Sequence, residues 1–191
     1  RNSVQLPNKG QRTELAAEFA GGFLGGPKEY YKLELRTAWY FRGFAEGHVI
    51  ELVGRTGAAQ SLETSDVPFY DRYYLGGMYT LRGFEYREVS PRQKGFSEPI
   101  GGDTFWFGSV EYSIPIMEKL RVAAFYDIGN VTSDPYSYRW VGFSDNVGLG
   151  IRLNLPIGPL RLDYGIPIHY TKQSSDGNGQ FQFGVGWERP F

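Results

Sequence analysis

Residues 144–155 read Ser-Asp-Asn-Val-Gly-Leu-Gly-Ile-Arg-Leu-Asn-Leu, a run in which aliphatic side chains alternate with polar or small ones. The odd-numbered positions from 147 to 155 are all aliphatic, and the even-numbered positions from 146 to 154 are polar or glycine. Successive side chains of a β-strand point to opposite faces. This period of two therefore predicts a strand with one apolar face and one wet face.

The same alternation recurs on both sides of this run. The other segments that show it are 12–19, 32–39, 50–55, 104–115, 118–130, 158–168 and 179–188. Eight candidate strands with turns between them predict an all-β, antiparallel protein.

The apolar faces of these strands can point in either of two directions. A soluble barrel buries them inside, whereas a membrane barrel turns them toward lipid and keeps water inside. Strands of about 10 residues match a tilted crossing of the bilayer core. Aromatic residues gather near strand ends, as in 30–31, 39–41 and Trp187, which is typical of interfacial girdles. These features favour a transmembrane β-barrel, and a soluble ligand-binding β-barrel is the alternative.

The connections between the strands are unequal in length. Residues 116–117 and 157–158 fall in very short turns, whereas 131–143 and 167–178 are longer and polar. The stretch 62–103 is far longer than an ordinary hairpin loop and needs a function or an anchor. Short turns at one end and long loops at the other are typical of outer-membrane barrels.

Composition excludes several classes of protein. The chain has 191 residues, a net charge of −1, 26 Gly and no Cys, and its mean hydropathy of −0.39 is too polar for a bundle of membrane helices. The near-neutral charge argues against nucleic acid as a partner, and the lack of Cys excludes disulfides and thiolate metal sites. The first residues lack a Met and an apolar signal core, so they look like the middle of a larger protein.

The chain offers little to catalysis or metal binding. His48 and His169 are far apart in sequence and have no zinc-type spacing. No nucleophile-elbow or phosphate-loop motif occurs, and the acids are spread along wet faces rather than paired. We therefore expect no enzyme activity, no metal and no cofactor, with a Ser-His-Asp hydrolase as a remote alternative.

The tetrapeptide Leu81-Arg82-Gly83-Phe84 lies in the long loop. A guanidinium offers a planar fork of donors that suits carboxylates, and Glu111 and Asp127 lie on the wet faces of neighbouring predicted strands. If the loop folds into a lumen, these acids are natural partners for Arg82. The alternative is that Arg82 is solvated and the acids merely line a pore.

The stretch from Phe69 to Phe84 resembles the lumen loop of BamA-like outer-membrane assembly factors, whose hallmark is Val- or Ile-Arg-Gly-Phe/Tyr. Leu81 is a mild departure from that motif at its first position. Further segments similar to this family are 99–104, 109–112, 125–131, 148–152, 156–164 and 181–187. The resemblance covers almost the whole chain, and the ordered series is more specific than the Arg-Gly-Phe motif alone.

The resemblance implies that residues 1–191 are the C-terminal half of a sixteen-stranded transmembrane barrel, with 62–103 as the lumen loop. It also implies that Arg82 pairs with Glu111 and Asp127. The last strand would form a weak seam with the first strand of the barrel, and its candidate residues are Phe181, Phe183, Gly184, Gly186 and Trp187.

The function implied is the folding and insertion of β-barrel clients in the outer membrane of a Gram-negative cell. The implied partners are outer-membrane lipid, unfolded clients, and accessory lipoproteins reached through periplasmic domains that this chain lacks. A polypeptide-exporting pore related to TpsB or TamA, which carries a similar loop, is the alternative within the superfamily, and a passive channel is another.

Overall fold

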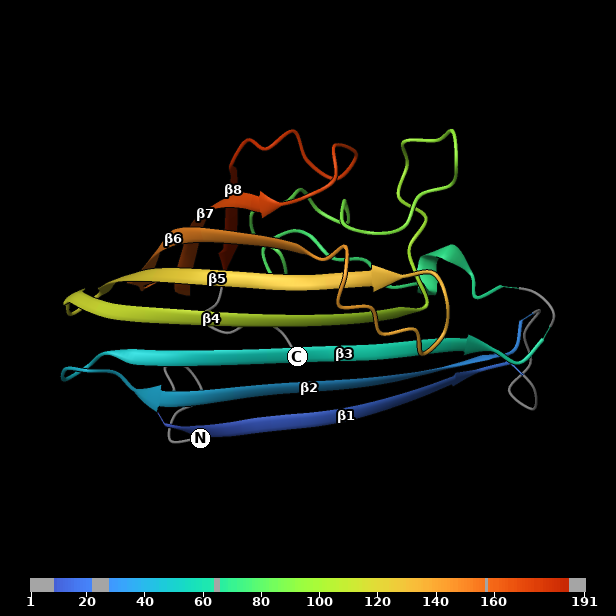
Figure 1. The fold of residues 1–191 in the computed structure, drawn as a ribbon. Helices are drawn as coiled ribbons and strands as arrows, with labels where there is room; N and C mark the ends of the chain where they lie inside the picture. The colour runs from blue at the N-terminus through green and yellow to red at the C-terminus, as the bar shows by residue number, and fades with distance from the viewer. Residues whose placement is uncertain (1–8, 22–27, 64–65, 157, 186–191) are drawn as a thin grey trace.

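The computed structural model describes residues 9–21, 28–63, 66–156 and 158–185. Eight strands form one antiparallel sheet in which each strand pairs with its neighbours in sequence (Figure 1). The strands are β1 Gly10–Ala20, β2 Tyr30–Arg42, β3 Val49–Ser61, β4 Thr104–Met117, β5 Leu120–Thr132, β6 Ser144–Leu155, β7 Gly158–His169 and β8 Gln180–Val185. The predicted all-β, eight-stranded fold is confirmed.

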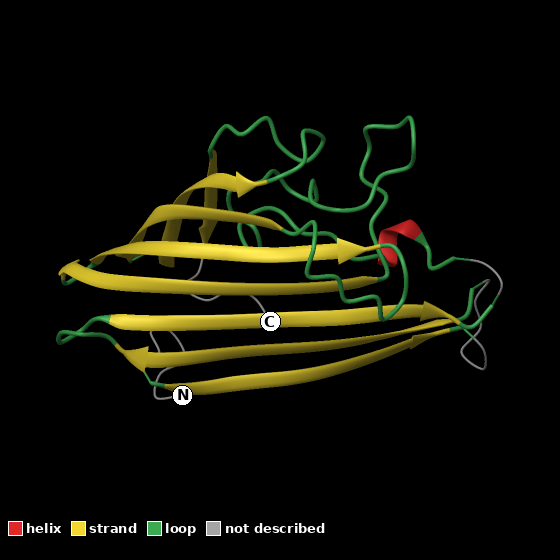
Figure 2. Ribbon diagram, in the orientation of Figure 1, coloured by secondary structure: helices red, strands yellow, loops and turns green. Residues whose placement is uncertain are grey.

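The sheet is open among the described residues, with β1 and β8 at its two edges. It curves, so that β6–β8 turn away from the plane of the first five strands (Figures 1 and 2). Tight connections lie at one end of the sheet, where Met117 pairs with Leu120 and Leu155 pairs with Gly158. The long connections, including 62–103, lie at the opposite end. No helix in the described part of the chain has the length and hydrophobicity needed to cross a bilayer.

One strand is considerably longer than the alternation predicts. The pattern indicated residues 50–55, but β3 extends from Val49 to Ser61. The second half of β3 contains Gly57, Ala58 and Ala59, small residues that hide the period of two. Their pairing with β2 and β4 keeps the strand regular despite this weak local preference.

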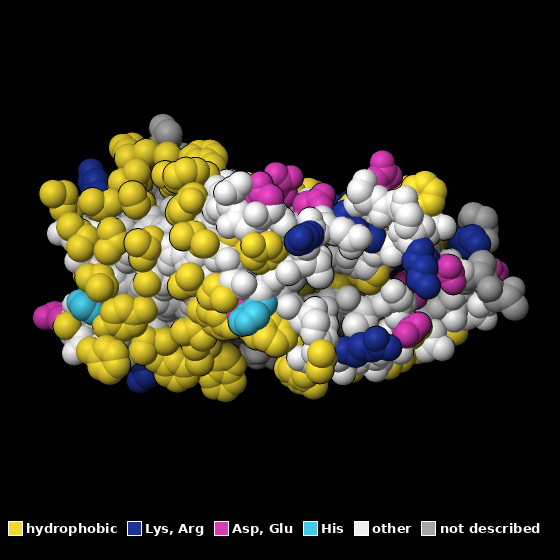
Figure 3. Space-filling view, turned by 45° about the horizontal axis from the view of Figure 1, so that its top comes forward, with side chains coloured by type: hydrophobic (Ala, Val, Ile, Leu, Met, Phe, Trp, Pro, Cys, Tyr) yellow, Lys and Arg dark blue, Asp and Glu magenta, His cyan; other side chains and the backbone are white. Residues whose placement is uncertain are grey.

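Aliphatic side chains cover the outer surface of the sheet. On β6 the side chains of Val147, Leu149 and Ile151 are 45%, 69% and 41% exposed, whereas Asn146 and Arg152 on the other face are buried. In Figure 3 hydrophobic side chains cover roughly one half of the visible surface, and charged side chains lie mainly over the other half. The outward apolar face is the arrangement that a membrane barrel requires.

The long loop packs against the inner face of the sheet. It contains a 3-10 turn, Phe69–Asp71, and the isolated bridges Tyr73–Gly102, Leu75–Val89 and Arg92–Pro99. Its apolar side chains form a core with residues of β4 and β5. The members buried there include Leu75, Leu81, Phe84, Val89, Phe105, Phe107 and Val131. This core fixes the loop as a compact unit although it has almost no regular secondary structure.

Candidate functional site

Two glycines allow the loop backbone to touch the sheet. A Cβ atom placed on Gly165 of β7 would lie 2.6 Å from the backbone nitrogen of Gly83, and one placed on Gly83 would lie 2.6 Å from the Cβ of Asn146. Neither distance leaves space for a side chain. The close approach brings Arg82 down onto the inner face of the strands.

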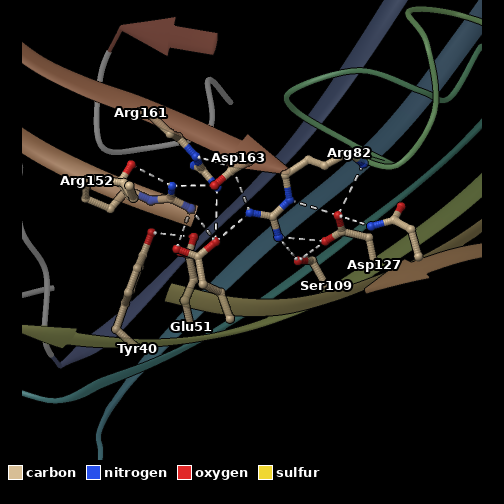
Figure 4. Close-up of polar contacts among 11 residues, drawn as sticks. Tyr40, Glu51, Arg82, Ser109, Asp127, Arg152, Arg161 and Asp163 are labelled. Atoms are coloured by element: carbon tan, nitrogen blue, oxygen red, sulfur yellow. Dashed lines mark hydrogen bonds and ion pairs between the residues drawn. The ribbon is translucent and has the colours of Figure 1, made fainter. Parts of the chain in front are cut away.

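Arg82 is completely buried and binds acids from three different strands (Figure 4). Its Nε and Nη2 donate to the two carboxylate oxygens of Asp127 on β5, both at 2.8 Å. Its Nη1 donates to Glu111 on β4 at 2.6 Å and to Asp163 on β7 at 3.2 Å. The guanidinium carbon also lies 3.4 Å from the ring centroid of Phe125. The fork is therefore fixed by charge, by direction and by a cation–π contact.

Two more arginines complete an ionic cluster. Arg152 of β6 contacts both oxygens of Glu111, at 2.9 and 3.0 Å, and also Asp163. Arg161 of β7 contacts Glu111 at 3.1 Å and Asp163 at 3.0 Å. We call these six residues the arginine cluster: Arg82, Arg152, Arg161, Glu111, Asp127 and Asp163. Its three cations and three anions balance, which lowers the cost of burying them.

Neutral side chains hold Asp127 from the remaining directions. Ser109 of β4 donates its hydroxyl to Asp127 Oδ1 at 2.6 Å, and Asn146 of β6 donates its amide to Oδ2 at 3.1 Å. The backbone nitrogen of Arg82 also donates to Asp127 at 3.3 Å. Asp127 thus fixes both the side chain and the main chain of the motif.

The electrostatics keep Arg82 charged. Burial by itself would lower the pKa of its guanidinium, but the negative charges of Asp127, Glu111 and Asp163 outweigh this effect and raise the pKa above its ordinary value. Protonated arginine has no acceptor, so the cluster is a structural tie rather than a group that exchanges protons.

The structure brings together Arg82, Glu111 and Asp127, the three charged residues singled out from the sequence. It also adds Asp163, Arg152 and Arg161, which sequence reasoning placed on wet faces but did not assign to the site. A signal for them was present. The short turn after β6 makes Arg152 and Arg161 direct register partners. Two like charges that face each other across a strand pair are destabilising, so nearby acids were to be expected.

The other motif residues have different environments. Leu81 and Phe84 are fully buried in the core beneath the loop. On β8, Phe181 and Phe183 point outward and are 72% and 65% exposed. Gly184 is on the inner face, with Met78 of the loop beside it. Gly186 and Trp187 lie outside the described residues.

Neither histidine belongs to the arginine cluster. His48 Nδ1 lies 2.7 Å from the hydroxyl of Tyr112, next to the turn between β2 and β3. His169, at the end of β7, has a side chain that is 63% exposed, and its Nδ1 is 2.9 Å from Asp145. Within the described ranges, no three His, Asp or Glu side chains converge as a metal ion would require.

Another buried acid, Asp103, lies outside the arginine cluster, where the loop rejoins the sheet. Burial raises the pKa of Asp103 to about 6, with smaller contributions from Asp66 and Asp134 of the same sign, while Arg72 acts to lower it. The Nε of Arg72 is 3.8 Å from Asp103 Oδ1, too far for a hydrogen bond. Asp103 is thus a weakly compensated charge.

The antiparallel sheet has an apolar outer surface, and its inner surface binds a loop through buried ion pairs. These features define a portion of a membrane-spanning β-barrel. Comparison with known proteins identifies the superfamily. The Omp85 superfamily domain matches residues 1–188, and the chain belongs to that superfamily.

Related proteins cover nearly the whole chain. It is 31% identical over 188 residues to the outer membrane protein assembly factor BamA of Nitratidesulfovibrio vulgaris, covering 97% of this chain and 24% of that protein. It is 27% identical to the human sorting and assembly machinery component 50 homolog, covering 97% of this chain and 42% of the relative.

A solved structure shows the same fold. The crystal structure of BamA from Haemophilus ducreyi lacking POTRA domains 1–3 has a TM-score of 0.80 and 24% identity, over 97% of this chain and 40% of the other. The chain spans about a quarter to less than half the length of these relatives.

Proposed function

We propose that this chain is the C-terminal membrane part of a factor that folds and inserts β-barrel clients into the outer membrane of a Gram-negative cell. The observation that carries the proposal is the 31% identity, over 97% of the chain, to a protein named as an outer membrane protein assembly factor. The related human protein is likewise named as a sorting and assembly component. The proposed role is mechanical rather than enzymatic.

The arginine cluster supplies the rigid part of this proposal. Arg82 ties the loop 62–103, as a lumen loop, to β4, β5 and β7 through Glu111, Asp127 and Asp163, and Arg152 links β6 to the same cluster by pairing with Glu111. The loop then fixes the curvature of this half of the barrel. A rigid wall allows strain to be confined to the barrel's seam.

The edge strand β8 is the proposed place where client strands pair with the barrel. In lipid, a client strand cannot leave its backbone groups unpaired, so it must hydrogen-bond as it enters. An edge strand offers a row of donors and acceptors that an incoming strand can pair with. The six-residue β8 has Gly184 on its inner face, and a glycine weakens a strand interior. We infer that β8 opens to receive client strands, with Phe181, Phe183 and Gly184 as seam residues; Gly186 and Trp187, the other seam residues predicted from the sequence, lie outside the described residues.

The partners follow from this role. They are the lipid around the outward apolar face, unfolded barrel clients at the edge, and accessory lipoproteins that contact periplasmic domains of the complete protein.

The test uses the full-length protein in liposomes of outer-membrane lipid. A urea-denatured outer-membrane barrel is added, and its folding is followed by heat-modifiability on gels. Faster client folding than in empty liposomes supports the proposal. Ion conductance with no effect on client folding refutes it in favour of a passive channel. Transfer of the client into the liposome interior, instead of insertion, refutes it in favour of an export pore.

A further inference from the structure

The Arg-Gly-Phe motif extends its grip beyond the arginine cluster to the edge strand. The side-chain amide of Gln182 on β8 donates to the carbonyl oxygen of Phe84 at 3.0 Å. The same carbonyl accepts the backbone N–H of Gly77, at 3.1 Å. Phe84 itself is fully buried, so the loop side of the bond is held rigidly.

Strand register places this contact beside the cluster. Gln182 is the direct partner of Asp163 across the β7–β8 pair, and Asp163 binds Arg82. Arg82 and Phe84 therefore contact two residues that lie directly opposite each other on neighbouring strands, and such strands are about 5 Å apart.

A second contact from the same loop reaches β8. Met78 lies against Gly184, close enough that a Cβ atom there would be 3.2 Å from the methionine Cε. Gln182 and Gly184 both face inward, while Phe183 between them and Val185 beyond them face outward, with 65% and 64% exposure. The loop thus touches β8 at two points on one face, one polar and one apolar.

We propose that Gln182 is a positioning residue: with Met78, it clasps β8 to the loop and so restrains the opening of the seam. The inference rests on the proposed function for its consequence, but not for the contact itself. The clasp gives the buried motif a direct hold on the strand that a client must reach. Weakening it frees β8 while the arginine cluster stays intact.

The first experiment measures hydrogen exchange of the β8 amides in the full-length protein in lipid. Gln182→Leu removes the donor at similar size, and Gln180→Leu makes the same change on the same face two residues earlier. Loss of one hydrogen bond at this site predicts about five-fold faster exchange in 180–185 for Gln182→Leu only. Unchanged exchange in Gln182→Leu, or an equal increase in Gln180→Leu, overturns the clasp.

The second experiment does not depend on the folding of those variants. The chain has no cysteine, so a pair can be introduced cleanly and joined with a short bifunctional thiol reagent. Met78→Cys with Gly184→Cys should cross-link, and Met78→Cys with Val185→Cys should not, because the sheet lies between them. Equal yields from the two pairs contradict the proposed contact.

The consequence for function is measured separately. The Gln182→Leu variant should fold clients in liposomes faster than the wild type, because β8 is held less tightly to the loop. If hydrogen exchange in β8 becomes faster but the rate of client folding is unchanged, the contact between Gln182 and the loop does not control the seam. Failure of the wild-type protein to accelerate any client refutes the proposed function instead, and the exchange and cross-linking results distinguish the two.

Discussion

Replacing Arg82 by Met should destabilise the folded barrel strongly, because the remaining acids stay buried. The substitution keeps most of the side-chain volume and removes the contacts to Asp127, Glu111 and Asp163. The balance of three cations and three anions becomes two and three. Removing one partner of a desolvated ion pair costs about 3–5 kcal/mol, and we expect a loss of that size.

The cluster also predicts how the loss can be partly reversed. Asp127→Asn added to Arg82→Met returns the cluster to two cations and two anions, and Ser109 and Asn146 remain beside the new amide. The double variant should recover about 1–2 kcal/mol relative to the single one, since neighbouring sites are not additive. Arg82→Lys keeps the charge but loses the two-pronged fork, and should cost about 1–3 kcal/mol.

Urea unfolding of the full-length protein in lipid vesicles, followed by tryptophan fluorescence, measures these changes. Arg87→Met is the matched control, since Arg87 lies in the same loop but stacks on Tyr74, 4.0 Å from the ring centroid, instead of entering the cluster. It should cost less than about 1 kcal/mol. A midpoint for Arg82→Met that equals the wild type, or a double variant less stable than the single one, would refute the argument from buried charge.

Three further outcomes are expected. Gly165→Ala should lower stability and displace the loop, because its Cβ would collide with the backbone of Gly83. Gly108→Ala should be tolerated, because its Cβ would make only an ordinary contact at 3.6 Å. Equal urea midpoints for the two variants would contradict this prediction. Asp103 has a folded pKa of about 6, above the value of about 4 in an unfolded chain, so the folded state holds the proton more tightly and stability falls as pH rises between these values. Asp103→Asn should remove that slope in unfolding midpoints between about pH 4 and 6, and an unchanged slope would assign the titration to another group. Leu149→Lys should cost about 2–4 kcal/mol of folding free energy in bilayers and Leu149→Val less than about 1 kcal/mol, whereas a harmless lysine would mean that this face does not meet lipid.

The strands and their two faces could be predicted from the sequence because a period of two is a local property. The run 144–155 coincides with β6, and its aliphatic side chains lie on the exposed face as predicted. The second half of β3 could not be predicted in this way. Gly57 and the alanines that follow it carry no alternation, and only the neighbouring strands show that the segment is paired.

The arginine cluster was only partly predictable. Arg82, Glu111 and Asp127 follow from a motif and from strand faces, but Asp163 lies 81 residues after Arg82. Its participation depends on the curvature that brings β7 beneath the loop, which no local pattern encodes. Arg152 and Arg161 could have been found by combining the tight turn with the register it imposes.

The distance in sequence between the motif and its partners has a consequence for the order of biogenesis. Arg82 is synthesised before all of the acids that bind it, and the bond from Gln182 to Phe84 spans 98 residues. Contacts of such long range form late, because the intervening chain must first be ordered. The full set of these contacts can therefore form only after β4 to β8 have all been ordered. A chain that stops before β7 would leave Arg82 with Glu111 and Asp127 but without Asp163, and would leave the carbonyl of Phe84 without its bond from Gln182.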